Sequence, residues 1–420
     1  MRSFITARFA ALALMGAAAL SAPRAPVSAQ QTPKVGLPAA YDGGFLVFQS
    51  ADSSFRYWLD GRLQLDGAVY TGSKNALANG TEVRRARLGG KMDMYRTWHG
   101  EVDFDFTKNA VEMKDMWVGY TGYDNSIIKL GNYKEPFSLE TLTSSKYITF
   151  LERSYADNFS PDRNIGLGYA RWGSWWQAAA GAFGQTAGSV DASGRDEGYA
   201  FTGRFTMAPI NRPGRLLHFG GAISRRTPPG DAAPDTNTMR LRARPETNVS
   251  QARFFTTGKV RLVDHVSLYN AELATVYGRV SLQAESTIED MHRMNGLATP
   301  SFNASYVFVS YFLTGETRPY LVQEGEFDRI VPRSSRGAWE VAGRVSGIDL
   351  NDPSTGVAIL GGKGTNYTLG VNWYINANFK WMLNYVRVVT DNNAKPDMGV
   401  APFQTGDQFS ILQSRFALAF

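Results

Sequence analysis

After residue 55 the chain consists largely of segments of about ten residues in which apolar and polar side chains alternate. In the first segment the apolar positions are Tyr57, Leu59, Leu63 and Leu65. The polar positions between them are Arg56, Asp60, Arg62, Gln64 and Asp66. Successive side chains of a β-strand point to opposite faces, so such a strand has one apolar and one charged face. Strands of soluble sheets are usually shorter, about 5 to 6 residues. The repeated pattern is typical of a membrane barrel with lipid outside and water inside.

Gly, Asn and Asp separate these segments, and the pattern predicts an all-β fold, a transmembrane antiparallel β-barrel of about 16 strands over residues 55–420. The strands are expected to begin near Phe55, Glu82, Trp98, Glu112, Ser126, Asn164, Trp175, Tyr199, Arg215, Leu268, Arg279, Phe302, Ala338, Thr365, Phe379 and Gln408. If the chain enters from the periplasm, even-numbered gaps are short turns and odd-numbered gaps are outer loops. The long gaps Lys134–Arg163 and Thr227–Ser267 are odd, whereas Gly315–Gly337 is a long even gap that the pattern does not explain.

The first 29 residues have the order of a secretory signal peptide. Arg2 and Arg8 form a positive region, an apolar run covers Phe9–Leu20, and the small residues Val27-Ser28-Ala29 suit a cleavage site. Residues 30–54, with several Pro and Gly, are expected to be a periplasmic lead-in to the barrel at 55–420. The predicted location is the cell outer membrane of a Gram-negative bacterium, reached by export and cleavage.

Composition excludes several classes of protein. The absence of cysteine excludes disulfides, thiolate metal sites and a cysteine nucleophile. The one long apolar run is shorter than the ~20 residues that a membrane helix needs. The net charge of +6 falls by three when Arg2, Arg8 and Arg24 leave with the signal peptide. This mild balance argues against a nucleic-acid partner.

We find no pattern that predicts catalysis, a metal or a cofactor. The four histidines, His99, His218, His265 and His292, lack the spacing of a helical metal site. His265 lies near Asp264 and Ser267, but neighbours on a strand point to opposite faces, so a catalytic triad is not expected. The glycine-rich residues 361–365 lack the first glycine of a phosphate loop. The protein is therefore predicted not to be an enzyme.

Aromatic residues gather where a barrel would meet the headgroups. Beside the proposed periplasmic turns stand Trp98, Trp172, Trp175, Trp176, Trp373 and Trp381, which are expected to form a girdle. The chain ends in an alternating strand, residues 416–420, whose terminal Phe420 resembles the signal read by the outer-membrane assembly machinery. That last strand must pair with the first, because an open edge is not tolerated in lipid.

Five segments carry a family resemblance: VRRARLG at 83–89, KLGNYKEPFSLE at 129–140, FLERS at 150–154, YFLTGETR at 311–318 and GAWE at 337–340. They resemble the phosphate-selective porins O and P of Gram-negative outer membranes. The resemblance implies a barrel of sixteen strands, a homotrimer, and a third loop, Lys134–Arg163, that folds inward to narrow the pore. It implies passive diffusion of small inorganic anions, most of all phosphate or polyphosphate. The expected surroundings are outer-membrane lipid and lipopolysaccharide.

The resemblance also implies that arginines from strands and from a long outer loop line the anion path. Guanidinium stays charged and offers a rigid fork of donors to an oxyanion, and rings of Arg and Lys are the expected selectivity device of an anion pore. Arg240, Arg242 and Arg244 are spaced by two and point to one side of an extended segment. The candidate path is Arg62, Arg84, Arg85, Arg87, Lys91, Lys129, Lys134, Lys146, Arg153, Arg240, Arg242 and Arg244.

Acidic residues at the same inward phase leave alternatives open. They are Asp60, Asp66, Asp93, Glu101, Asp103, Asp105 and Asp115. Walls of opposite charge would set up a transverse field, as in general porins, so a pore of the same fold with weak ion selectivity is the first alternative. The second is a barrel enzyme or surface-binding protein that acts through its outer loops.

Overall fold

The computed structural model describes residues 39–42, 45–107, 110–188, 197–229, 237–354, 356, 358–398 and 401–420. The predicted signal peptide lies outside the described residues. Of the predicted lead-in, β1 (Ala39–Asp42) and β2 (Phe45–Gln49) form an antiparallel pair, and Val47–Gln49 of β2 pair with the start of the first barrel strand. That the lead-in is periplasmic stays a prediction.

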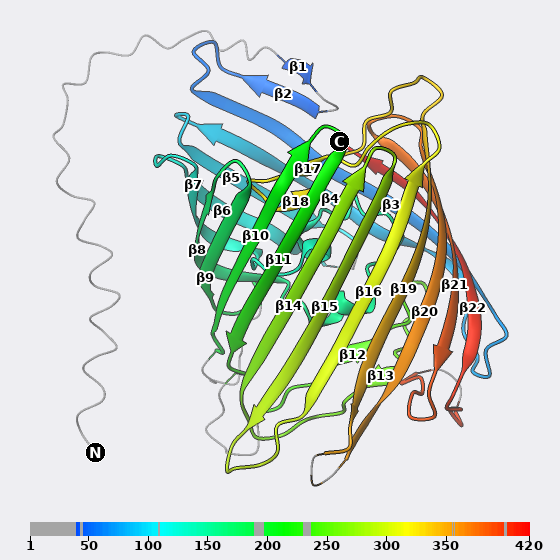
Figure 1. Ribbon diagram of the computed structural model, residues 1–420. Coiled ribbons are helices and arrows are strands. Elements are labelled where there is room, and N and C mark those ends of the chain that lie inside the picture. The colour runs from blue at the N-terminus through cyan, green and yellow to red at the C-terminus, as the bar shows by residue number, and fades with distance from the viewer. Residues whose placement is uncertain are drawn as a thin grey trace, which may run out of the picture. The chain divides into compact units, whose positions relative to one another are not determined.

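Sixteen antiparallel strands of the described chain close into a barrel (Figure 1), as the alternation predicted. Every expected strand is present, and each begins within six residues of its expected start. The barrel strands are β3 (Phe55–Thr71), β4 (Gly80–Met94), β5 (Trp98–Asp105), β6 (Glu112–Tyr120), β7 (Ser126–Lys134), β8 (Arg163–Trp172), β9 (Trp176–Phe183), β10 (Ala200–Arg212), β11 (Arg215–Arg226), β14 (Val263–Tyr277), β15 (Val280–Arg293), β16 (Ser301–Phe312), β19 (Ala338–Asp352), β20 (Ile359–Tyr374), β21 (Phe379–Thr390) and β22 (Gln408–Ala419).

The last strand closes the barrel against the first. β22 pairs with β3 from Ala419 opposite Arg62 to Ser410 opposite Thr71. The backbone of Phe420 exchanges two hydrogen bonds with Gly61, at 2.8 and 3.1 Å. A side chain at position 61 would have its Cβ only 2.4 Å from the Phe420 ring. A larger residue at position 61 would therefore have to displace the terminal aromatic ring where it crosses the first strand.

The barrel wall is lower on one side, which we call the low side, because its strands are shorter there. Strands β5 to β9 contain 8 to 10 residues, whereas the other barrel strands contain 12 to 17. Short connections join strands at one end, which we call the turn end, and long ones at the other, the loop end. The exception is the connection between β16 and β19, which we call the turn-end hairpin (residues 313–337) because it contains the pair β17 (Tyr320–Leu321) and β18 (Glu326–Phe327).

Over their described residues, two outer loops fold inside the barrel. Loop L3, residues 135–162, carries the helix α2 (Leu139–Leu142) and the 3-10 helix η1 (Tyr155–Phe159). Loop L5, residues 227–262, carries β12 (Arg242–Ala243) paired with β13 (Phe255–Thr256). The inward course of the third loop is the one the sequence predicted.

The two loops form a hydrophobic core with one wall of the barrel. Phe150 of L3 packs edge-on against Phe308 of β16, with ring centroids 5.5 Å apart, and Tyr155 packs likewise on Phe255 of L5 at 5.3 Å. In β16 the inward phase is apolar, so the expectation of a polar inner face fails on this wall. The reason is that the loops, and not water, cover it. Burial of these aromatic rings holds both loops against the wall.

The tryptophans only partly follow the expected girdle. Trp98 and Trp175 are exposed on the outer surface, and Trp373 stacks on Trp339 with centroids 5.3 Å apart. Trp172 instead lines the central cavity, because it continues the inward phase of β8. Among the described residues no helix is long and apolar enough to cross a membrane.

Candidate functional site

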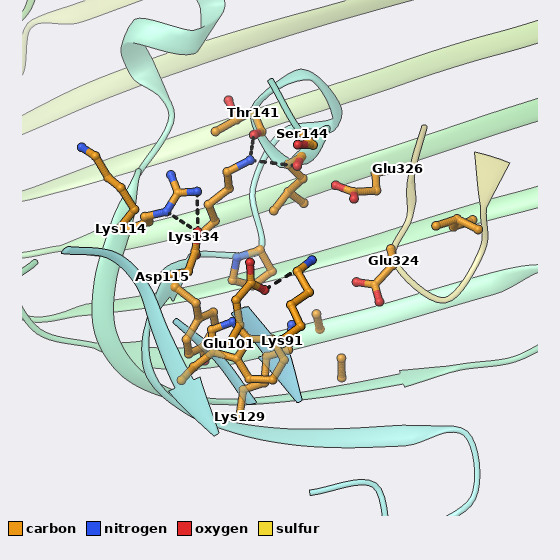
Figure 2. Close-up of a pocket in the computed structure, with 18 of the residues that line it drawn as sticks. Lys91, Glu101, Lys114, Asp115, Lys129, Lys134, Thr141, Ser144, Glu324 and Glu326 are labelled. Carbon is orange, nitrogen blue, oxygen red and sulfur yellow. Dashed lines mark hydrogen bonds and ion pairs between the residues drawn. The ribbon is translucent and has the colours of Figure 1, made fainter. Parts of the chain in front are cut away.

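A cavity of about 890 Å³ runs between L3 and the wall built by β3 to β9 (Figure 2). It lies there because L3 and L5 pack against the opposite wall, while several inward side chains in the middle of β8 and β9 are small. Gly168, Ala170 and Ala179 stand at lining positions on that wall. At the turn end, residues of the turn-end hairpin complete the lining.

Nine of the twelve residues predicted for the anion path line this cavity. They are Arg62, Arg84, Arg85, Arg87, Lys91, Lys129, Lys134, Lys146 and Arg153. The structure therefore brings together side chains from β3, β4, β7 and L3. Arg240, Arg242 and Arg244 are not among its lining residues.

A β-bulge places three arginines of β4 on the inner face. Gln64 pairs with Arg85 while Leu65 pairs with Val83, so Arg84 is the extra residue on its strand. Strict alternation would point Arg84 and Arg85 to opposite faces, but a bulge re-aims one side chain. Arg84, Arg85 and Arg87 consequently form a basic ladder that descends from the loop end, with Lys91 further along the same strand.

Most rungs of this ladder are paired with acids. Arg84 donates to both carboxylate oxygens of Glu152 in L3, at 2.8 and 2.9 Å, and Arg87 donates to Asp105 at 2.8 Å. Arg85 donates to the Gln64 amide oxygen at 2.8 Å. Among the described residues, Arg85 has no carboxylate within 4 Å, so it remains a cation without a counter-ion.

Two predicted path residues hold L3 in shape. The Lys134 ammonium donates to the carbonyl oxygens of Thr141 and Leu142, and the Arg153 guanidinium donates to those of Glu140, Thr141 and Thr143. These carbonyls lie at and after the end of α2, where a helix leaves acceptors without partners and favours cations. Lys134 and Arg153 thus have a structural role, and their charges still face the cavity.

The tip of L3 is tied to β3. Lys146 donates to Asp60 at 2.7 Å, and Arg62 donates to the Ser145 hydroxyl at 2.9 Å. Burial opposes the charged form of Lys146 more strongly than Asp60 favours it, and lowers the lysine pKa to about 8. Arg62 also lies 3.6 Å from both Asp60 and Asp103.

Lys129 approaches aromatic rings and no acid within 4 Å among the described residues. Its ammonium lies 4.4 Å from the centroid of the Trp117 ring and 5.8 Å from that of Tyr133. Such contacts stabilise a cation without neutralising its charge. Lys129 is therefore free to attract an anion in the cavity.

The three arginines of L5 lie elsewhere. Arg240 and Arg242 are exposed and Ala243 between Arg242 and Arg244 is buried, so the predicted one-sided arrangement exists. Arg244 donates to Asn248 at 2.6 Å and to Gln251 at 2.5 Å. Asn248 in turn donates to Glu82 at the start of β4, which places this arginine above the basic ladder.

The predicted inward acids do not form a separate wall. Each has a basic side chain within 4 Å, in the pairs Asp60–Lys146, Asp66–Arg415, Asp93–His99, Glu101–Lys91, Asp103–Arg62, Asp105–Arg87 and Asp115–Arg163. Acids and bases alternate on one wall because neighbouring strands place them opposite one another. The whole cavity is lined by eleven Arg and Lys and nine Asp and Glu, an excess of two positive charges.

The predicted anion path omits a group of residues that line the cavity. Glu324, Glu326 and Asp328 of the turn-end hairpin face the cavity, as do Lys114 and Arg163. The signal was the length of Gly315–Gly337, too great for a turn. A segment of that length must fold against the barrel or project from it, and its charged residues favour the water-filled lumen.

The side chains of Asp264 and His265 meet, although strict alternation predicts that they point to opposite faces. A bulge between Val263 and His265 lets the His265 ring hydrogen-bond the adjacent Asp264 carboxylate at 2.7 Å. The ring stacks on His292 with centroids 4.2 Å apart, and in the described part of the chain no serine hydroxyl bonds to it. The described residues also contain no cluster of three His, Cys, Asp or Glu fit to hold a metal ion.

Comparison with known proteins agrees with this architecture. The family model described as phosphate-selective porin O and P matches residues 58–420. Porin O of Pseudomonas aeruginosa is 29% identical over 400 residues, which cover 85% of this chain and 89% of that protein. The anion-selective porin from Comamonas acidovorans superposes with a TM-score of 0.54 at 14% identity, over 87% of this chain and 100% of that one.

A trimer form of OmpT from Vibrio cholerae also superposes with a TM-score of 0.54, at 11% identity, over 87% of this chain and 100% of that chain. At these low identities the solved structures show a shared fold and nothing more. The family match, in contrast, covers the barrel and includes strand β4 with its basic ladder. The chain belongs to the phosphate-selective porin O and P family of outer-membrane channels.

Proposed function

We propose that the protein is a passive outer-membrane diffusion channel for small anions, with phosphate or polyphosphate as its leading cargo. The observation that carries this proposal is the basic ladder: Arg84, Arg85 and Arg87 face one cavity that also contains Lys129. Arg85 and Lys129 have no acid within 4 Å among the described residues, so they can attract a passing oxyanion. Both the family and the description of the Comamonas porin as anion-selective support an anion as cargo.

The path continues toward the loop end through L5. Arg244 lies above the ladder, and Arg240 and Arg242 are exposed beyond it. We infer that these three arginines collect anions before the ladder passes them inward. Weak sites in series suit conduction, because each must release its ion to the next.

The alternation of acids and bases favours one alternative, a pore of the same fold with weak selectivity. An excess of two positive charges over twenty charged lining residues is modest. The alternatives differ in how the current responds to phosphate. An anion path with oxyanion sites predicts block of a chloride current by millimolar phosphate, whereas a weakly selective pore predicts none.

Substitution of the loop arginines tests the upper part of the path. Replacing Arg240, Arg242 and Arg244 with alanine should lower the anion preference measured in planar bilayers. Arg387→Met is the control, because with the described residues this arginine makes two long hydrogen bonds, at 3.3 and 3.4 Å, and it is absent from the cavity lining. Unchanged selectivity in the triple variant would remove L5 from the mechanism.

The assembly is proposed to be a homotrimer in outer-membrane lipid and lipopolysaccharide, made after cleavage of residues 1–29. The low side supports the trimer: on β9 the outer face carries the small residues Ala178, Ala180 and Ala182, so a second barrel can approach closely. OmpT, which shares the fold, is described in a trimer form. Delivery by the assembly machinery through Phe420 belongs to the same proposal. Cross-linking in native membranes would show trimers if the proposal holds.

A further inference from the structure

The turn-end hairpin presents carboxylates to the cavity on a rigid turn. Glu324 and Glu326 flank Gly325, whose backbone has φ of 64° and whose amide donates to the carbonyl oxygen of Leu321 at 2.8 Å. A side chain at position 325 would place Cβ 2.6 Å from the Arg204 guanidinium. The turn therefore requires glycine and fixes the two glutamates on either side.

Buried contacts anchor this hairpin to the barrel wall. Arg204 donates to the Gly325 carbonyl oxygen at 2.8 Å, and His218 and the Tyr320 hydroxyl share a hydrogen bond of 2.7 Å. The Arg318 guanidinium of the hairpin lies 5.4 Å from the centroid of the Phe308 ring of β16. With backbone and side chains held in this way, the carboxylates are a fixed part of the lumen.

The hairpin carboxylates face lysines that do not neutralise them. Figure 2 shows Glu324 and Glu326 on the opposite side of the space from Lys91, Lys129 and Lys134. Lys134 and Lys91 act on Glu326 electrostatically, yet among the described residues neither comes within 4 Å of it. Lys91 is paired with Glu101 and Asp60, at 3.6 and 3.7 Å, whereas Lys129 has no acid within 4 Å among the described residues, so Lys129 is the unneutralised cation opposite the hairpin carboxylates.

A gap between separated charges of opposite sign favours one kind of occupant. A simple anion would bind the lysines and face the glutamates, and a simple cation would do the reverse. A solute with one anionic and one cationic group satisfies both sides at once. We propose that the hairpin and the lysines opposite it form a site for a small zwitterion with an oxyanion group and an ammonium group.

This inference rests on the proposed anion channel and specifies a solute class for it. Glu324 is exposed to the lumen, whereas Glu326 is half-buried among Lys134, Lys91, Arg204 and Glu324. Burial, opposed by the two lysines, raises the pKa of Glu326 to about 8. Glu326 therefore gains its negative charge in mildly alkaline solution, and the site is tested there, with Lys129 as the cation opposite it.

The test compares two blockers that differ only in the ammonium group. Phosphoethanolamine and ethyl phosphate are titrated against the KCl current of the full-length protein in planar bilayers at about pH 8.5, where a primary amine is still protonated. An added exposed ion pair is worth up to about threefold to fivefold in affinity. Phosphoethanolamine should half-block at a concentration lower by that factor.

Two variants localise the effect. In the double variant Glu324→Gln with Glu326→Gln the two blockers should become equal. The control Asp264→Asn removes a carboxylate outside the cavity, on the outer surface beside His265, and should keep the difference. If the double variant does not assemble, Glu324→Gln alone, at an exposed position, should reduce the difference.

Equal half-blocking concentrations in the unmodified protein overturn the zwitterion site, whatever the variants do. If ethyl phosphate and inorganic phosphate still block, the anion channel stands and only the zwitterion site fails. If neither phosphate nor ethyl phosphate blocks and the current is cation-selective, the anion channel fails. Block by phosphoethanolamine alone would then support the zwitterion site without that function.

Discussion

Arg344 of β19 joins L3, L5 and the barrel wall, and its removal should loosen the pore lining. The guanidinium donates to Glu246 of L5 at 2.6 Å and to the Glu152 carbonyl oxygen of L3 at 3.0 Å. It also lies 4.4 Å from the centroid of the Phe150 ring. The side chains of Arg344 and Glu246 are only 2% and 1% exposed. Arg344→Met therefore leaves a buried carboxylate without its counter-ion.

The expected cost is about 3 to 5 kcal/mol, the range for breaking a buried ion pair on one side. The barrel should survive, because its closure depends on strand pairing and not on this arginine. L3 also keeps other anchors, among them Arg415, which donates to the Leu151 carbonyl oxygen. The cost should therefore appear as loop motion: a noisier open current, higher mean conductance and faster trypsin cleavage within L3 and L5.

The assay is single-channel recording in parallel with limited proteolysis of the folded protein. Adding Glu246→Gln to Arg344→Met removes the orphaned charge and should restore much of the quiet current. Arg387→Met serves as the matched control, since that arginine is outside the core that L3 and L5 form with the barrel wall. Wild-type noise and protease resistance in Arg344→Met would refute the view that this residue holds the two loops.

Three further outcomes are expected. Gly61→Val should displace the Phe420 ring and lower the yield of folded, heat-resistant barrel, and normal yield would show that this crossing is dispensable. Anion preference should fall as pH rises through about 8, because Lys146 loses a positive charge and Glu326 gains a negative one, both outcomes making the cavity less positive. Bilayer reversal potentials at each pH check this, and Glu326→Gln should flatten the change. Arg85→Met with Lys129→Met should raise the half-blocking phosphate concentration by roughly tenfold if each cation contributes about 0.7 kcal/mol, whereas an unchanged value would place the phosphate site elsewhere.

The barrel could be predicted from sequence because lipid imposes a strict rule. Every spanning strand must show an apolar outer face, so alternation persists through β3 to β22 and turn residues mark the breaks. The inward residues Arg62, Arg87 and Lys91 followed from that phase alone. Closure by the final strand followed from the exclusion of open edges.

The bulge, the apolar inner wall and the turn-end hairpin depend on local backbone geometry and loop packing, which the alternation of residues does not determine. The bulge adds Arg84 as an extra residue of β4 and leaves no turn signal, so alternation alone does not predict that Arg84 points inward, although Arg84 was among the predicted path residues. The inward aromatics Tyr306 and Phe308 contradict a polar lumen unless the path of L3 is known. The separated charges of the turn-end hairpin require the fold of residues 313–337, for which the sequence gives a length but no direction.

The central claim is that the cavity favours anions, and the reversal potential under a KCl gradient tests it most directly. The purified protein is placed in a planar bilayer with a higher KCl concentration on one side. The excess of two positive charges predicts a reversal potential of the sign set by chloride, as do Arg85 and Lys129, which have no acid within 4 Å in the described part of the chain. A reversal potential of the sign set by potassium would contradict the account.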